Sequence, residues 1–237
     1  MHRTRTPLRT WFWAACLVAT PHPGISAKQL QRELGLSRYE TAWLMLHKLR
    51  RAMIAPERSL LTTEVEVDEF FLGGLEEGLK GGRQRGKKAL VGVAIEVRGR
   101  GSGRLRFQVL PDIVAGRDGA ARQRAVVVAE RAQAVVAAPA VGMHDRAGGR
   151  RRGHERAQGV GAGVLPRAHR AISNLKAWMH GTHRGVSDQH LAVYLNEFVF
   201  RHNRRGTPMA AFQTLLGLGT ARRPTTYRQM TESENAA

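Results

Sequence analysis

The chain has 237 residues, of which 42% are hydrophobic, so it can form one large domain or two small ones. Lys and Arg number 38 against 19 Asp and Glu, which gives a formal net charge of +19. A surplus of this size is typical of proteins that bind a polyanion, most often nucleic acid. No stretch reaches the roughly 20 apolar residues of a transmembrane helix, so we expect no membrane partner.

Cys16 is the only cysteine, which excludes a disulfide framework and a cysteine-based zinc site and favours a reducing, cytoplasmic setting. Three arginines before an apolar run at residues 11–19 resemble a signal peptide. That run contains two Trp and lacks a clear small-x-small cleavage site. We therefore interpret it as a buried helix, with export as the lesser alternative.

The pattern of residues 7–53 predicts three helices. Ser26 and Ser37 each begin a capping box, and Gly35 separates the second helix from the third. Two helices around a glycine turn, the second longer and basic, are typical of a helix-turn-helix. The alternative is a plain three-helix bundle with a solvated basic face. The basic residues expected to face DNA on the third helix are Arg38, Lys48 and Arg51.

Apolar residues at helical spacing predict which faces of the first and third helices are buried. On the first helix these residues are Leu8, Trp11, Phe12, Ala15 and Leu17. On the third helix they are Tyr39, Ala42, Leu46, Leu49 and Met53.

Residues 61–110 change to a period of two and predict three consecutive antiparallel strands. In the first of these, Val65 and Val67 occupy one face, while Glu66 and Asp68 occupy the other. Carboxylates are unusual in strands. Their oxygens are the ligands that divalent cations such as Mg²⁺ prefer, so Asp68 is a candidate metal ligand. The alternative is a solvated strand face with salt bridges to nearby Lys and Arg.

Residues 111–164 have a different composition, because Leu, Lys, Ser, Thr, Asn and aromatic residues are all missing. Leu is normally among the commonest residues of a folded segment. No fourth strand can be recognised there. Two interpretations of the segment are that it is disordered and that it is read out of frame through paired insertions and deletions. The second interpretation is favoured, because ordinary composition resumes abruptly at Leu165. The alternative is a flexible basic linker.

The C-terminal part predicts a helix at residues 170–179, a turn at 180–185 and a long amphipathic helix that begins at Ser187. A last short helix follows at residues 209–216. The long helix ends in basic residues that are further candidates for DNA contact: Arg201, Arg204 and Arg205.

Five motifs stand in the order found in one family of proteins: PLRTW at 7–11, ISAKQL at 25–30, YETAW at 39–43, VEVDE at 65–69 and YLNEFVFRHNRR at 194–205. With them the chain resembles the bacterial insertion-sequence transposases of the ISXO-like DDE family. The resemblance covers residues 3 to about 112 and 165 to about 228. It implies an α+β protein with an N-terminal helix-turn-helix and an RNase H-like catalytic domain. It also implies metal-dependent cleavage and transfer of DNA strands.

The resemblance places catalytic residues on some positions of this sequence. Asp68 matches the first catalytic Asp, and Lys176 matches a Lys that commonly accompanies the third position. His169, seven residues before Lys176, is the expected third metal ligand, with Asn174 as the runner-up. No counterpart of the family's Thr-Asp-Gly-Trp-like motif is found, and Asp145 is the nearest candidate for the second Asp by position alone.

The cofactor implied by the resemblance is Mg²⁺ or Mn²⁺, and the implied partner is double-stranded DNA, as terminal repeats and target. Association with a second copy of the chain, in a homo-oligomer, is left open. The family's N-terminal zinc ribbon has no counterpart here, and no zinc site is expected. The expected organisation is a helix-turn-helix domain at 1–60, three strands at 61–112, the unusual segment at 113–164, C-terminal helices of the catalytic domain at 165–218 and a tail at 219–237. Because the fourth strand and its Asp are not recognised, we expect a catalytically defective copy. The alternative function is a non-enzymatic DNA-binding protein.

Overall fold

The computed structural model describes residues 4–21, 23–54, 60–73, 88–110, 140–143 and 165–220, together with 226, 227 and 230. Their contacts form two compact units, which we call unit 1 (Met1–Arg58 and Asn174–Ala237) and unit 2 (Ser59–Ser173). The boundary falls within a helix, α5 (Pro166–Trp178). The fold class is α+β, as expected. Among the described residues, no helix combines the length and apolar character needed to cross a membrane.

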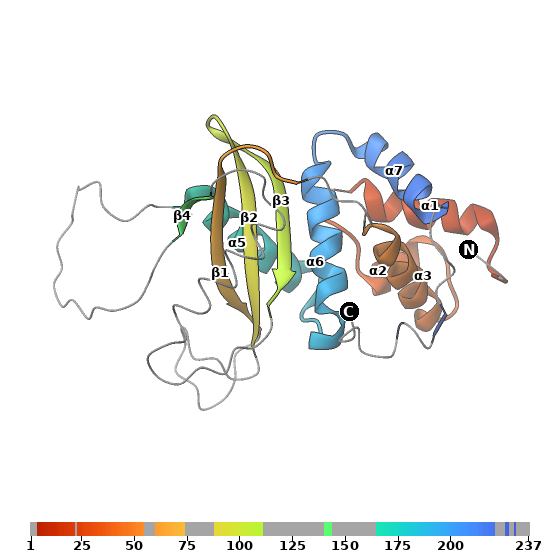
Figure 1. Cartoon of the computed structure of the whole chain (residues 1–237). Coiled ribbons are helices and arrows are strands. Elements are labelled where there is room, and N and C mark those ends of the chain that lie inside the picture. Colours follow the sequence, from red (N-terminus) through yellow and green to blue (C-terminus); the bar gives the residue numbers. More distant parts are fainter. Residues whose placement is uncertain are drawn as a thin grey trace, which may run out of the picture. The chain divides into compact units, whose positions relative to one another are not determined.

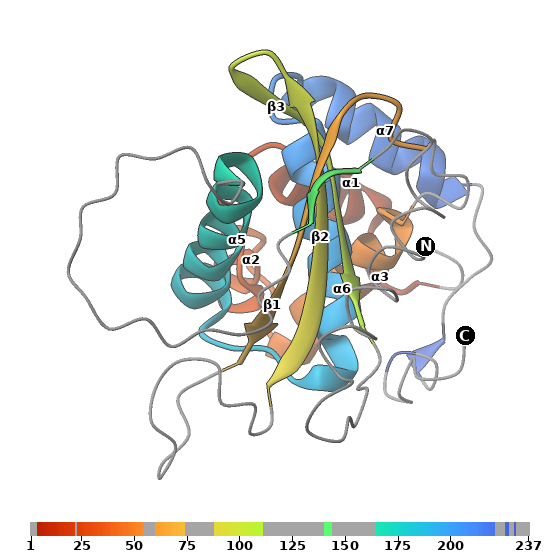
Figure 2. The same ribbon diagram turned by 60° about the vertical axis from the view of Figure 1, so that its left-hand side comes forward.

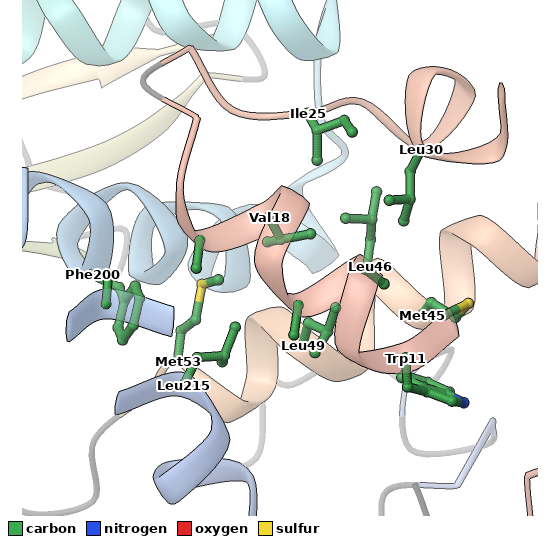
Figure 3. Packing of buried hydrophobic residues seen from close by; sticks show 14 of the residues in the cluster. Trp11, Val18, Ile25, Leu30, Met45, Leu46, Leu49, Met53, Phe200 and Leu215 are labelled. Atoms are coloured by element: carbon green, nitrogen blue, oxygen red, sulfur yellow. The ribbon is translucent and has the colours of Figure 1, made fainter. Parts of the chain in front are cut away.

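Unit 1 is built from helices (Figure 1). In chain order the helical elements are α1 (Leu8–Ala19), α2 (Ala27–Glu33), α3 (Tyr39–Ala52), the π-helical turn Met179–His183, α6 (Asp188–Asn203) and α7 (Pro208–Thr220). Helix α3 contacts α1, α2, α6 and α7, so it is central to the unit. Figure 3 shows the core around it, with Leu46 and Leu49 of α3 beside Val18 of α1 and Leu215 of α7.

The predicted cap at Ser26 and the predicted turn at Gly35, on either side of α2, are confirmed, whereas the predicted cap of α3 is wrong. The Ser26 hydroxyl accepts the Gln29 N–H at 3.2 Å, and Gly35 takes a left-handed φ of +59° after the helix. Helix α3, in contrast, has Arg38 at its N-cap position and no side-chain cap. The predicted capping box at Ser37 is therefore absent, because the helix begins one residue later than that motif requires.

The buried face of α1 agrees with the predicted one at Trp11 and Ala15 but differs elsewhere. Leu8 and Phe12 are 56% and 45% exposed, and the buried residues are Trp11, Ala14, Ala15, Val18 and Ala19. Alanines form most of this face because small side chains let neighbouring helices approach closely, a preference that a search for large apolar residues misses. On α3, Ala42, Leu46, Leu49 and Met53 are buried as predicted, but Tyr39 is exposed.

Unit 2 contains a four-stranded sheet in the order β3-β2-β1-β4, seen in Figures 1 and 2. Its long strands are β1 (Val65–Leu72), β2 (Ala89–Arg98) and β3 (Gly101–Val109). They pair antiparallel, with Asp68 opposite Val93 and Phe107 opposite Val93 on the next strand. Val65 and Val67 are buried, as the alternating pattern predicts. The three consecutive antiparallel strands are thus confirmed.

The fourth strand, which the sequence pattern did not reveal, is present as β4 (Ala140–Met143). It pairs with β1 in parallel, with Val65 opposite Ala140 and Val67 opposite Met143. The expectation that no fourth strand exists between residues 112 and 164 is therefore wrong. Four residues of sequence AVGM carry too little alternation to be recognised, so pairing with β1 defines this strand rather than local propensity. The rest of segment 113–164 lies outside the described residues.

The C-terminal helices α6 and α7 pack with α1 and α3 of unit 1. The sequence-based organisation had joined residues 165–218 to the catalytic domain. By contacts, only the first turns of α5, through Ser173, belong with the sheet.

Candidate catalytic site

Strand β1 presents two carboxylates, Glu66 and Asp68, two residues apart and therefore on one face. The Asp68 side chain is 13% exposed, so it is shielded but still open to solvent. Its Oδ1 accepts the backbone N–H of Glu69 at 2.8 Å. This hydrogen bond fixes the carboxylate and leaves Oδ2 for another partner.

That partner is His169, from the first turns of α5. Its Nε2 lies 3.2 Å from Asp68 Oδ2, and the imidazole is 44% exposed. The sequence separation is 101 residues, so the pair exists only because α5 lies beside β1 (Figure 2). The pairing brings together the two residues that the resemblance had assigned to the first and third catalytic positions.

Glu66 holds the start of α5, a role that the sequence did not suggest. Its Oε2 accepts the backbone N–H groups of Arg167 and Ala168, each at 2.8 Å. Its Oε1 lies 2.9 Å from the guanidinium Nη1 of Arg167. The only sequence signal was the second acidic residue on the face of Asp68, which alone would have indicated a metal ligand.

A divalent cation at this site would find donor atoms on two residues. Asp68 offers a carboxylate oxygen and His169 an imidazole nitrogen, whereas Glu66 is occupied by three N–H donors. Within the described part of the chain, no group of three His, Cys, Asp or Glu could hold a metal ion. Mg²⁺ commonly keeps several waters and binds through one or two carboxylates plus phosphate oxygens. Of these ligands the pair supplies one carboxylate, Asp68, to which His169 adds a nitrogen donor.

The other predicted site residues lie further along α5 or outside the described residues. Lys176 is seven residues after His169, so it lies on the same side of the helix two turns later. Asn174, five residues after His169, is about 140° away around the helix axis, which favours His169 over Asn174 as the partner of Asp68. Asp145 lies outside the described residues. In sequence it comes two residues after the end of β4 at Met143.

The predicted DNA-binding residues of α3 differ in exposure. Arg38 is exposed at the N-terminal end of the helix. Lys48 is half-buried, with its Nζ 5.9 Å from the centroid of the Trp11 ring. Arg51 is also half-buried. Arg38 is therefore the best placed of the three to contact a ligand.

The basic residues at the end of α6 have structural partners. Arg201 donates to the carbonyl oxygen of Pro21 and lies 3.5 Å from Glu197, with only 10% of its side chain exposed. The guanidinium of Arg204 lies 4.2 Å from the centroid of the Phe200 ring. Arg205 is exposed. These contacts favour a structural role for Arg201 and leave Arg205 the most accessible of the three.

Comparison with protein families finds a match to the model described as the ISXO2-like transposase domain, over residues 60–203. The matched range includes β1, β4 and α5, and therefore Asp68 and His169. No curated protein and no solved structure matches the chain.

Proposed function

The chain belongs to the family of ISXO2-like transposase domains, whose model matches more than half of it, and we propose that it acts as an insertion-sequence transposase that cleaves and joins DNA. Membership of this family implies DNA as a partner. The observation that carries the proposal is the approach of Asp68 and His169 to 3.2 Å within the matched residues.

The strand arrangement supports an RNase H-like catalytic domain. Three antiparallel strands are followed by a fourth that is parallel to the first, in the order β3-β2-β1-β4. Asp68 lies on β1, Asp145 follows β4 in sequence, and His169 lies on α5. The order along the chain is thus the one the resemblance implies for the first, second and third catalytic positions.

Asp68 and His169 would hold the divalent ion, with Asp145 as a further ligand. A bound Mg²⁺ or Mn²⁺ supplies positive charge that stabilises the phosphate oxygens during strand cleavage. The residues of the protein would orient the metal ligands and the DNA phosphate. The N–H of Glu69 fixes one oxygen of Asp68, and the side chain of His169 is 44% exposed. Lys176, as a cation on the same side of α5, would position a phosphate group.

The N-terminal helices would bind the DNA at the ends of the insertion sequence. Helices α2 and α3 contact each other around Gly35, and the exposed Arg38 lies at the start of α3. In a helix-turn-helix, the N-terminal residues of the second helix contact base edges in the major groove. This arrangement supports α3 as the recognition helix.

Strand cleavage tests the proposal. Supercoiled plasmid carrying both ends of the element is incubated with the full chain and Mg²⁺ or Mn²⁺, and nicked product is measured. The sequence predicted a defective copy because no fourth strand was recognised. Since β4 is present and precedes Asp145 in sequence, we instead expect nicking by the unmodified chain. Asp68→Asn should lose at least 100-fold, because the first ligand of the ion is lost. Glu64→Gln is the matched control, since Glu64 is an exposed carboxylate directly before β1. Equal nicking by Asp68→Asn and the unmodified chain would exclude Asp68 as the catalytic carboxylate.

A second candidate function is DNA binding without cleavage. The observation that favours it is that the described residues bring together two candidate ligands and not three. Two-metal phosphoryl transfer needs several carboxylate oxygens at one place. This candidate predicts salt-sensitive DNA binding together with background nicking that is the same with and without Asp68.

A further inference from the structure

We propose that Glu66 is a positioning residue: it holds the first turn of α5 on β1 and so keeps His169 against Asp68. The inference rests on the proposed function for the importance of the Asp68–His169 pair, and on geometry alone for the contact between Glu66 and α5.

The carboxylate of Glu66 is engaged by protein donors on both oxygens. Oε2 accepts two backbone N–H groups, and Oε1 accepts the Arg167 guanidinium. Its side chain is 7% exposed. A carboxylate on the face of Asp68 would ordinarily be counted as a second metal ligand. Here the carboxylate of Glu66 is buried and accepts hydrogen bonds from residues of α5, so its contacts are with the helix.

Helix α5 needs a partner at its N-terminus, because the first N–H groups of a helix have no acceptor within the helix. Pro166 begins the helix and has no N–H to satisfy. The next two N–H groups, of Arg167 and Ala168, both point to Glu66. A negative charge at this end is also favoured by the helix dipole. Glu66 therefore serves as an N-cap supplied by a strand 101 residues away in sequence.

The side chain of Arg167 makes a second attachment. Its Nε donates to the Gly101 carbonyl oxygen at 2.8 Å, and its Nη2 donates to the Gly99 carbonyl oxygen. The Gly99 oxygen belongs to the turn between β2 and β3, and the Gly101 oxygen belongs to the first residue of β3. Arg167 is thus held at both β1 and the hairpin turn, which fixes the rotation of α5 about its axis.

The consequence for the site follows from the spacing of the contacts. Glu66 binds residues 167 and 168, and Asp68, two residues further along β1, meets residue 169. A rotation of α5 by one residue, about 100°, would turn His169 away from Asp68. The Glu66–Arg167 pair therefore selects which side chain of α5 faces the catalytic carboxylate.

The experiment compares Glu66→Gln with the unmodified full chain. The amide group of Gln keeps the shape of the side chain but replaces one acceptor oxygen with a donor. We expect amide hydrogen exchange in the first turn of α5 to become at least 10-fold faster. We also expect the affinity for Mn²⁺, measured by calorimetry, to fall several-fold, less than in Asp68→Asn. Arg167→Ala, which leaves β1 unchanged, should act in the same direction, and Glu64→Gln should do neither.

The two readouts separate this inference from the proposed function. Unchanged exchange in Glu66→Gln and Arg167→Ala overturns the positioning role. So does an unchanged Mn²⁺ affinity in these variants when Asp68→Asn loses binding. If Glu66→Gln abolishes Mn²⁺ binding without faster exchange, Glu66 is a ligand and the inference is wrong. If Asp68→Asn keeps both Mn²⁺ binding and nicking, the proposed function fails, and hydrogen exchange alone then decides whether Glu66 holds α5.

Discussion

Buried histidines are an unusual feature of unit 1. His47 on α3 is 2% exposed, and its ring centroid lies 3.9 Å from that of Trp43 and 4.8 Å from that of His190. Burial, together with the nearby charge of Arg50, lowers the pKa of His47 to about 3. Burial likewise lowers the pKa of His183 and of His202 to about 4 each. All three histidines are therefore neutral at physiological pH.

These lowered pKa values predict that unit 1 loses stability in acid. The unfolded chain takes up protons at His below about pH 6.5, whereas folded His47 resists protonation until about pH 3. Stability is thus complete above pH 6.5 and declines as the pH falls below it. Between pH 7.5 and 5.0, His47 alone should contribute a loss of about 1–2 kcal/mol. Urea denaturation at both pH values measures the loss.

In His47→Gln, the pH dependence of the free energy of unfolding should be smaller by that amount, because one titrating group is removed. The exposed His180 provides the matched control, His180→Gln. Identical pH profiles for His47→Gln and the unmodified chain would show that His47 does not carry the effect.

At the scale of elements, Glu197 connects several parts of unit 1. This fully buried carboxylate of α6 lies 2.5 Å from Arg50 of α3 and 3.5 Å from Arg201, which in turn binds the carbonyl oxygen of Pro21. Burial acts to raise the pKa of Glu197, but the charge of Arg50 and further neighbours outweigh it, so the pKa is lowered. The ionised carboxylate thus holds α3, α6 and the segment before α2 together.

Removing that charge should strongly destabilise unit 1. In Glu197→Gln, Arg50 remains buried without a counter-charge, which typically costs about 3–5 kcal/mol. The free energy of unfolding from urea titration is the measurement. Asp188→Asn is the control, since Asp188 is an exposed carboxylate of the same helix, and it should cost less than about 1 kcal/mol. A loss below about 1 kcal/mol in Glu197→Gln would contradict this role.

Glycine is required at position 24, next to the side chain of Arg201. Gly24 has a φ of +77°, and a Cβ atom there would lie 2.5 Å from Arg201 Nη1 and 2.8 Å from Trp178 Nε1. The close approach leaves room for glycine alone. The segment before α2 is therefore shaped by its contacts to α6 and the end of α5, and not by its own sequence preferences.

At the scale of the whole molecule, the net charge of +19 predicts DNA binding that weakens steeply with salt. If Arg38 contacts a phosphate, Arg38→Ala should reduce the slope of log affinity against log salt by about one unit. Fluorescence anisotropy with duplex DNA across a salt series gives the slope. Arg100→Ala, which removes an exposed arginine of unit 2 and changes the net charge equally, should leave the slope unchanged. Equal slopes for Arg38→Ala and the unmodified chain would place the DNA-binding surface elsewhere.

The sequence alone determined the features that depend on near neighbours. The cap at Ser26, the turn at Gly35 and the alternation of Val65 and Val67 all rest on residues within a few positions of one another. Family motifs added Asp68 and His169 as members of one site. Their approach to 3.2 Å agrees with that assignment, although their catalytic role remains a prediction.

Tertiary structure alone decided the features that join distant segments. Strand β4 exists through its pairing with β1, Glu66 is used by the N-terminus of α5, and Arg201 is used by Pro21. From the sequence alone, a carboxylate such as Glu66 or a guanidinium such as Arg201 would be equally plausible on a solvated surface or in a ligand site. The partner lies between 75 and 180 positions away in the chain for β4, Glu66 and Pro21, so no local pattern encodes the contact. Burial then decides the outcome, because a buried charge or N–H group must be paired where it lies.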